Sequence, residues 1–257
     1  MDIESKFTLR YASDVGVPSA ADVELWNQRC PAVSELELPM QESAVVLCGG
    51  PSSSLFQQLG ANETLICVNR VSNSAAAYHI LASADVLLEM LQQISQSTVI
   101  VTSSALVGSD STGELAQALD LRQILAVRTD PDLFSKFKKR KPISADDYAK
   151  INLRETPYLP GASSGVFATA FALALGAKRI TQFGMDGWTQ FVRTGQSPYA
   201  DGAKWAFEAR GDEMMDYQES LVIEGLKRCK LFADEVGAEI INANPESSYQ
   251  AVLGHVI

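Results

Sequence analysis

The chain has 257 residues, of which 46% are hydrophobic and 20% are charged, so it is long enough to bury the core of one sizeable globular domain. Its net charge of −10 argues against general binding of nucleic acid, which needs a basic face. No apolar run reaches the roughly 20 residues of a membrane-spanning helix, and the charged N-terminus is unlike a secretory signal. The cysteines lack CxxC spacing, so we expect a cytoplasmic location and no structural zinc.

Residues 1–42 are predicted to form an irregular N-terminal extension. Their periodicity is weak, and prolines at positions 18, 31 and 39 interrupt them. One helix is predicted in this stretch, over 20–29. The rest of the chain, 43–257, is predicted to be one Rossmann-like nucleotide-binding domain.

Short apolar runs follow in chain order, each with the length of a buried strand. They cover 44–48, 65–68, 79–81, 98–102, 124–127, 179–183 and 239–242. Helix-compatible segments lie between them, at 52–59, 85–94, 113–119, 165–175 and 216–236, and a helix with a long surface excursion occupies 131–160. This alternation predicts a single doubly wound α/β domain of Rossmann type, with a mostly parallel sheet and right-handed crossovers.

A glycine-rich turn, LCGGPSSS, follows the first strand. Gly49 and Gly50 allow a sharp turn and a close approach to a ligand. The helix start after Pro51 offers N–H groups to an anion, and the hydroxyls of Ser52 and Ser53 can bind phosphate or ribose. The turn is neither a GxGxxG motif nor a P-loop, and an N-capped helix after a tight turn is the alternative interpretation.

Three further features point to the same edge of the sheet. Asn69 leaves the second strand, and its amide can donate to a phosphate and accept from a sugar hydroxyl. Asp186 follows the sixth strand. Before that strand, Ser163, Ser164 and Gly165 begin an apolar helix with a second set of N–H groups and hydroxyls. Together these features predict a nucleotide site at the carboxyl edge of the sheet.

These blocks resemble the bacterial sialyltransferases of glycosyltransferase family 42, and the related 6-hydroxymethylpterin diphosphokinase-like and flagellin-glycosylation (motility-associated factor) proteins. In that superfamily one strand ends in G-x-G-P-S and the next in Asn. A later segment reads S-G-V, an alanine-rich helix, A-L-G-x-K-x-I, a strand and G-x-D. The matching segments are Gly50-Pro51-Ser52, Asn69, Ser164-Gly165-Val166, Ala174-Leu175-Gly176-Ala177-Lys178-Arg179-Ile180 and Gly184-Met185-Asp186. The order holds from about 44 to 245, although Gly49 stands where the sialyltransferases have Asn.

The resemblance implies a GT-A-like sialyltransferase variant of the fold and a nucleotide-sugar-dependent glycosyltransferase. The enzyme would be most like a CMP-sialic-acid-type transferase that acts by direct displacement. Residues 49–53, 163–165 and Asn69 would hold the nucleotide, with Asp186 beside them. In the sialyltransferases two tyrosines after G-x-D bind the leaving phosphate. The second matches Tyr199, and the first falls at Trp188, which has an N–H donor but no hydroxyl.

The histidine that the sialyltransferases place near the start of the last long helix has no counterpart here. Asp216 and Glu219 are the carboxylates in that region. They are three residues apart and share a helix face, so repulsion in a pocket would raise one pKa and favour proton transfer. We favour Glu219 slightly because its side chain is longer; a solvated helix face is the alternative. His79 lies in an apolar strand and is predicted to be a core or edge residue.

Two other functions stay open. A pterin-type diphosphokinase would hold ATP in the same turns with Mg²⁺, and Asp186 and Asp201 are the carboxylates we would then suspect. A nucleotide-binding module without turnover would account for the missing histidine. The transferase itself is expected to need no cofactor and no metal, since the CMP-sugar is a substrate.

The partners expected from the sequence are a nucleotide or nucleotide sugar and a glycan or other small acceptor, without nucleic acid. A homo-oligomer is an open alternative. The basic run from Lys136 to Lys141 is interpreted as a solvated helix end. Its alternative is a contact with an anionic acceptor or, peripherally, with a membrane surface.

Overall fold

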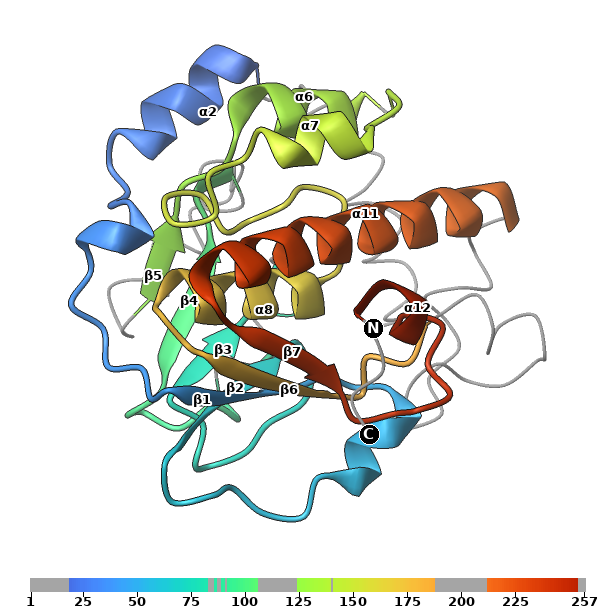
Figure 1. The fold of residues 1–257 in the computed structure, drawn as a ribbon. Coiled ribbons are helices and arrows are strands. Elements are labelled where there is room, and N and C mark those ends of the chain that lie inside the picture. Colours follow the sequence, from blue (N-terminus) through green and yellow to red (C-terminus); the bar gives the residue numbers. More distant parts are fainter. Residues whose placement is uncertain are drawn as a thin grey trace, which may run out of the picture.

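The computed structural model describes residues 19–82, 86, 89, 90, 92–105, 124–139, 141–187 and 212–253, with side chains of the last segment from 216 onward. One sheet of seven strands has the order β5-β4-β3-β2-β1-β6-β7, and every neighbouring pair is parallel (Figure 1). The strands are β1 (Ser43–Leu47), β2 (Glu63–Val68), β3 (Tyr78–Ile80), β4 (Val99–Ser103), β5 (Ile124–Val127), β6 (Arg179–Phe183) and β7 (Glu239–Asn242). Each lies within two residues of a predicted apolar run, so the predicted α/β fold with a parallel sheet is confirmed.

The described helices and turns of helix are α2 (Ala20–Asn27), η1 (Val33–Glu35), η2 (Pro51–Leu55), α6 (Pro131–Lys138), α7 (Ala145–Ala149), α8 (Ser164–Ala174), α11 (Asp212–Val236) and α12 (Gln250–Leu253). Among the described residues, none of these helices combines the length and the apolar character that crossing a membrane requires. The helix predicted at 113–119 lies outside the described residues.

Helix α8 lies between the sheet and α11 (Figure 1). All of its residues from Gly165 to Leu173 are buried, and its alanines keep its surface small enough to pack closely on β1, β2, β3 and β6. The Phe171 ring meets Tyr78 of β3 edge-on, with ring centroids 5.3 Å apart. Helix α11 approaches α8 closely at Gly225, where a Cβ would lie 3.0 Å from Val166 Cγ1.

Both faces of the sheet are covered, which is why its strands are almost continuously apolar. Val46 packs in the large cluster on the α8 side, whereas Val45 packs in a smaller cluster on the opposite side. Further along that opposite side, Val86 and Met90 of a partly described helix cover Ile100 of β4. This two-sided arrangement is the doubly wound architecture predicted from the sequence.

The described part of the N-terminal extension contributes to the main core. Helix α2 covers most of the predicted 20–29 segment and begins with a capping box between Ser19 and Asp22. Val23 of α2 and Val33 of η1 are both buried in the large cluster. Residues 19–42 therefore pack on the domain, although they contain no strand.

One predicted helix differs in the structure. The segment 52–59 was expected to be helical, but η2 is a 3₁₀ turn that ends at Leu55. Phe56 is extended there, and its ring packs edge-on against Phe183 with centroids 5.6 Å apart. The helix thus ends at a residue whose side chain packs against β6, a strand far away in the sequence.

Strand β1 is the point where the chain changes direction across the sheet. From β1 the chain adds β2 to β5 on one side, and it then returns to place β6 and β7 on the other. The connections after β1 and β6 therefore diverge at neighbouring strand ends, and α/β sheets bind ligands at such a switch point.

Candidate functional site

At the switch point, hydrogen bonds join the turn after β1 to the end of β6. Cys48 N donates to Phe183 O at 2.8 Å, and Gly50 N donates to Gly184 O at 3.1 Å. In the other direction, Gly184 N donates to Ser52 Oγ at 2.9 Å. The two connections are thus held as one unit beyond the ends of their strands.

Asp186 is the polar centre of this unit. It is 4% exposed, and its Oδ2 accepts from Ser52 N at 2.7 Å. Its Oδ1 accepts from Ser52 Oγ and, at 2.9 Å, from Asn244 Nδ2. Both side-chain oxygens of Asp186 are therefore hydrogen-bonded to the protein, as buried polar atoms generally are.

These contacts revise the predicted chemistry of the first turn. The N–H groups of the helix start after Pro51 were expected to face an anion, but that of Ser52 already donates to Asp186. The N–H of Gly50, just before Pro51, donates to Gly184 O. The Ser52 hydroxyl is likewise bonded to Asp186. Ser52 and Asp186 build the site, while ligand contacts of Gly49, Pro51 and Ser53 stay predictions.

The glycines of the site are required by packing. A Cβ at Gly50 would lie 2.5 Å from Gly184 O, and a Cβ at Gly184 would lie 2.2 Å from Cys48 O. At Gly165, which was predicted to begin the helix at the nucleotide site, a Cβ would meet Met185 Sδ at 2.2 Å and Cys48 Sγ at 2.8 Å. Gly165 thus brings the start of α8 against the β6 connection.

Removing the Ser52 hydroxyl is expected to destabilise the fold. In Ser52→Ala the buried Gly184 N–H loses its acceptor and Asp186 loses a donor, and such losses cost about 1–3 kcal/mol. Denaturant unfolding of Ser54→Ala is the control, because the exposed Ser54 hydroxyl bonds to Pro51 O alone among the described residues. Equal stability of the two variants would contradict this account of Ser52.

Asn69 ends β2 in an unusual conformation. Its φ is +53°, in the left-handed region that asparagine tolerates better than most residues. Its side-chain Oδ1 is buried and has no hydrogen-bond partner among the described residues. A buried acceptor without a donor is costly, so this atom marks a place where a ligand hydroxyl or amine would be favourable.

Helix α8 begins at the same carboxyl edge. Ser163 is its N-cap, and its hydroxyl accepts from Val166 N at 3.3 Å. The preceding N–H groups, those of Ser164 and Gly165, have no partner within the helix and lie at its positive end. These N–H groups suit an anion, so a phosphate contact at the start of α8 stays a prediction.

The two predicted bases differ in their surroundings. Asp216 is exposed on α11, whereas Glu219 is half-buried. Glu219 Oε2 accepts from Tyr249 Oη at 3.1 Å, and Oε1 accepts from Ser248 Oγ at 3.4 Å. A Cβ at Gly187 would lie 3.5 Å from Glu219 Oε1, so Glu219 lies beside the connection that carries Asp186.

Tyr249 fixes the orientation of the Glu219 carboxylate. Burial, and to a smaller extent the charge of the neighbouring Glu219, hold the pKa of Tyr249 well above its usual value. The phenol therefore stays protonated and donates to the carboxylate. This partner was not foreseen, because Tyr249 lies 30 residues further along the chain.

The connection after β7 is a second element that the sequence interpretation missed. Asn242 Nδ2 and Ser247 Oγ both donate to Met185 O, at 2.6 and 2.9 Å. Together with the bond from Asn244 to Asp186, they anchor the β6 connection from the other side. The signal was present, since Asn242 ends the run 239–242 and Asn244 follows it, much as Asn69 follows the second strand.

Several predicted site residues fall elsewhere. Trp188, Tyr199 and Asp201 lie outside the described residues, so their roles stay predictions. A cavity of about 290 Å³ lies against β1 and β6, on the face of the sheet opposite α8. Val45, Phe56, Phe183 and their neighbours line it. It contains none of the predicted site residues. Within the described ranges, no three His, Cys, Asp or Glu side chains are grouped as metal ligands.

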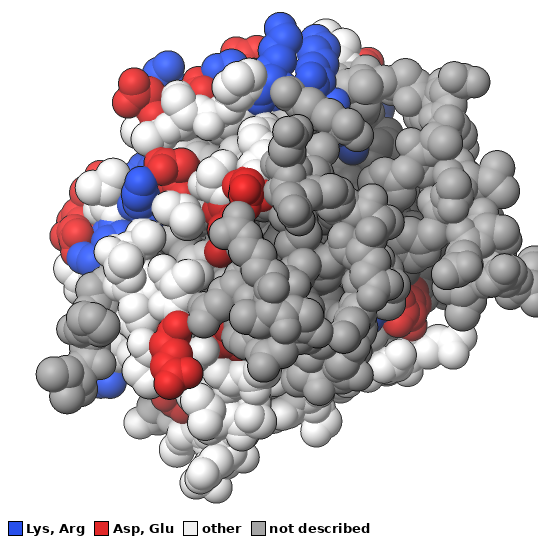
Figure 2. Space-filling model, turned by 90° about the vertical axis from the view of Figure 1, so that its right-hand side faces the viewer, with Lys and Arg blue, Asp and Glu red and all other residues white. Residues whose placement is uncertain are grey.

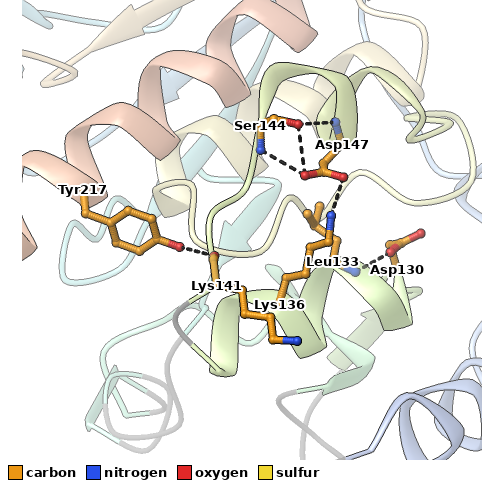
Figure 3. Close-up of polar contacts among 7 residues, drawn as sticks. All are labelled: Asp130, Leu133, Lys136, Lys141, Ser144, Asp147 and Tyr217. Carbon is orange, nitrogen blue, oxygen red and sulfur yellow. Dashed lines mark hydrogen bonds and ion pairs between the residues drawn. The ribbon is translucent and has the colours of Figure 1, made fainter.

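The basic run lies beside the site on α6 and the residues that follow it. Figure 2 shows Lys and Arg side chains gathered at the height of α6 and α7, with acidic side chains near them. Lys136 Nζ is 2.6 Å from Asp147 Oδ1, and this bond and the Ser144 N–H lower the pKa of Asp147 to about 2 (Figure 3). Lys136 is thus paired within the protein. The Lys138 and Lys139 side chains are exposed, although Lys138 Nζ lies 5.4 Å from the centroid of the Phe134 ring.

Helix α11 is tied to the same region. Tyr217 Oη donates to Lys141 O at 3.1 Å across the gap between α11 and the α6–α7 connection (Figure 3). Tyr217 lies two residues before Glu219 on α11. A contact of the basic run with an anionic acceptor or membrane surface stays a prediction.

The chain was compared with known proteins. No protein-family model matches it, and no curated protein does. Among solved structures it is similar to sialyltransferases of Campylobacter jejuni. The monofunctional α-2,3-sialyltransferase Cst-I is 18% identical, with a TM-score of 0.48 over 85% of this chain and 81% of that one. CstII, solved with the substrate analogue CMP-3FNeuAc, is 14% identical, with a TM-score of 0.43 over 83% and 85%.

Proposed function

We propose that this chain is a nucleotide-sugar-dependent glycosyltransferase that uses a CMP-sialic-acid-type donor. The observation that carries the proposal is the buried, unpartnered Oδ1 of Asn69 at the sheet edge where α8 begins. A nucleotide offers sugar hydroxyls and a base amine to such an acceptor, and its phosphate suits the helix start. The motif resemblance to the sialyltransferases favours CMP as the nucleotide.

The reaction we propose is a direct displacement at the anomeric carbon of the donor. The bond from that carbon to the phosphate oxygen breaks, and CMP leaves with the electron pair through an oxocarbenium-like state. The acceptor oxygen forms the new bond, and its proton passes to the Glu219 carboxylate. The N–H groups at the start of α8, together with Tyr199 and Trp188, stabilise the charge on the departing phosphate.

The proposal is tested by thermal unfolding with CMP, CDP, UDP, GDP and ATP, each with and without Mg²⁺. We expect CMP to stabilise the protein without Mg²⁺, by about 2.7 kcal/mol at 100 times its dissociation constant. Asn69→Gly is the matched variant, since glycine adopts the φ of +53° but lacks the amide. It should lose most of the CMP effect.

The other outcomes separate the alternatives. Stabilisation by ATP only with Mg²⁺ would favour the pterin-type diphosphokinase. CMP binding with no transfer from any CMP-sugar to glycan acceptors would favour a binding module. A protein that none of the five nucleotides stabilises would contradict the nucleotide site itself.

A further inference from the structure

The carbonyl of Asn69 is held by a buried side chain. His79, in the middle of β3, is 1% exposed, and its Nε2 lies 2.6 Å from Asn69 O. A carbonyl oxygen can only accept, so Nε2 carries the proton. Burial lowers the pKa of His79, which keeps the ring neutral at physiological pH.

The bond lies where β2 stops being a regular strand. Asn69 N still donates to Ile80 O at 3.0 Å, as the next rung of the β2–β3 ladder. With its φ of +53° the backbone then leaves the extended conformation, and the Asn69 carbonyl accepts from the His79 ring on the neighbouring strand. Both backbone groups of Asn69 are thus fixed by β3, one by its main chain and one by a side chain.

Asparagine tolerates the left-handed region better than most residues, but it adopts this conformation stably only where its surroundings favour it. Among the described side chains, that of His79 holds the Asn69 backbone there, through its bond to the Asn69 carbonyl. The residue so held is the one whose Oδ1 is buried without a partner. The structure therefore gives a core histidine a specific connection to the predicted ligand site.

We infer that His79 is a positioning residue of the nucleotide site: its Nε2–H holds the Asn69 carbonyl and keeps Asn69 in the conformation that presents its amide to the nucleotide. The inference rests on the proposed function for the nucleotide, but the bond and the conformation are independent of it. His79 itself need not touch the ligand.

The test compares His79→Leu, which removes the donor, with His79→Gln, whose amide nitrogen can take the place of Nε2. His79→Leu is expected to weaken CMP binding by about tenfold, the loss of one buried hydrogen bond, and His79→Gln to restore most of it. In the Asn69→Gly background His79→Leu should have no further effect on CMP affinity, because the amide it positions is gone. An equal loss in both backgrounds, or wild-type affinity in a folded His79→Leu protein, would overturn the inference.

A second measurement does not need a nucleotide. In protein labelled at asparagine, the ¹³Cα and ¹³Cβ shifts of Asn69 report its backbone conformation. We expect them to move toward extended values in His79→Leu and to stay in place in His79→Gln; unchanged shifts in His79→Leu would overturn the inference. If wild-type protein binds none of the five nucleotides, the proposed function fails, and these shifts still decide whether His79 holds Asn69.

Discussion

Glu219→Gln is expected to lower kcat by about 10²–10⁴-fold with little change in the affinity for CMP. General-base catalysis contributes this much, and glutamine keeps the shape of the side chain but cannot accept the proton. The expectation rests on the position of Glu219 beside Gly187 and on its bond from Tyr249. The measurement is a pH–rate profile with an identified donor and acceptor, together with CMP titration.

Asp216→Asn is the matched control for this variant. It removes the same charge from the same helix, one turn away, but from an exposed position. We expect its kcat to fall by less than about tenfold. Comparable kcat values for Glu219→Gln and wild type would rule out Glu219 as the base, and a large loss in Asp216→Asn alone would transfer the role to Asp216.

Among glycine-to-alanine changes in the described part of the site, Gly184→Ala is expected to destabilise the protein most. Gly184 has a φ of +73°, and the new Cβ would lie 2.2 Å from Cys48 O and 2.9 Å from Gly50 N. These are backbone atoms of the turn joined to β6, so they cannot yield without breaking its hydrogen bonds. We expect a loss of more than about 4 kcal/mol, a large part of the stability of an ordinary domain, seen as reduced folded yield and a lowered unfolding midpoint.

Gly237→Ala separates the steric effect from the conformational one. Gly237 also has a positive φ, of +66°, but no atom lies within 4 Å of its Cβ position. This variant should lose only about 1–2 kcal/mol, the cost of the left-handed conformation. If Gly184→Ala were no less stable than Gly237→Ala, the close joining of the β1 and β6 connections would be wrong.

The strands could be predicted because they lie in a sheet that is buried on both faces. A parallel sheet covered on both faces needs apolar residues at successive positions, so each strand appears as a short apolar run. His79 did not obscure β3, since its neighbours on the strand are apolar. The order of the strands in the sheet has no such local signal in the sequence. General rules predicted right-handed crossovers but not that order. The extent of η2 depended on Phe183, a residue far from it in the sequence.

The sequence predicted a candidate site at the carboxyl edge of the sheet, but the hydrogen-bond partners of its residues were not visible there. Residue type shows that Asp186 is a carboxylate after a strand. It does not show that Ser52 and Asn244 already satisfy both of its oxygens. Similarly, an asparagine at a strand end is common, whereas the φ of Asn69 and its unpartnered Oδ1 become apparent only in three dimensions.

The order of the strands has a consequence for biosynthesis. Strand β1 is made before the other strands of this sheet, yet one of its two partners, β6, pairs with it through residues such as Arg179 that are made much later. Until then a nascent sheet built from β1 to β5 ends in an open, apolar edge at β1. Such edges invite aggregation, so this chain is expected to depend on chaperones or on rapid completion of translation.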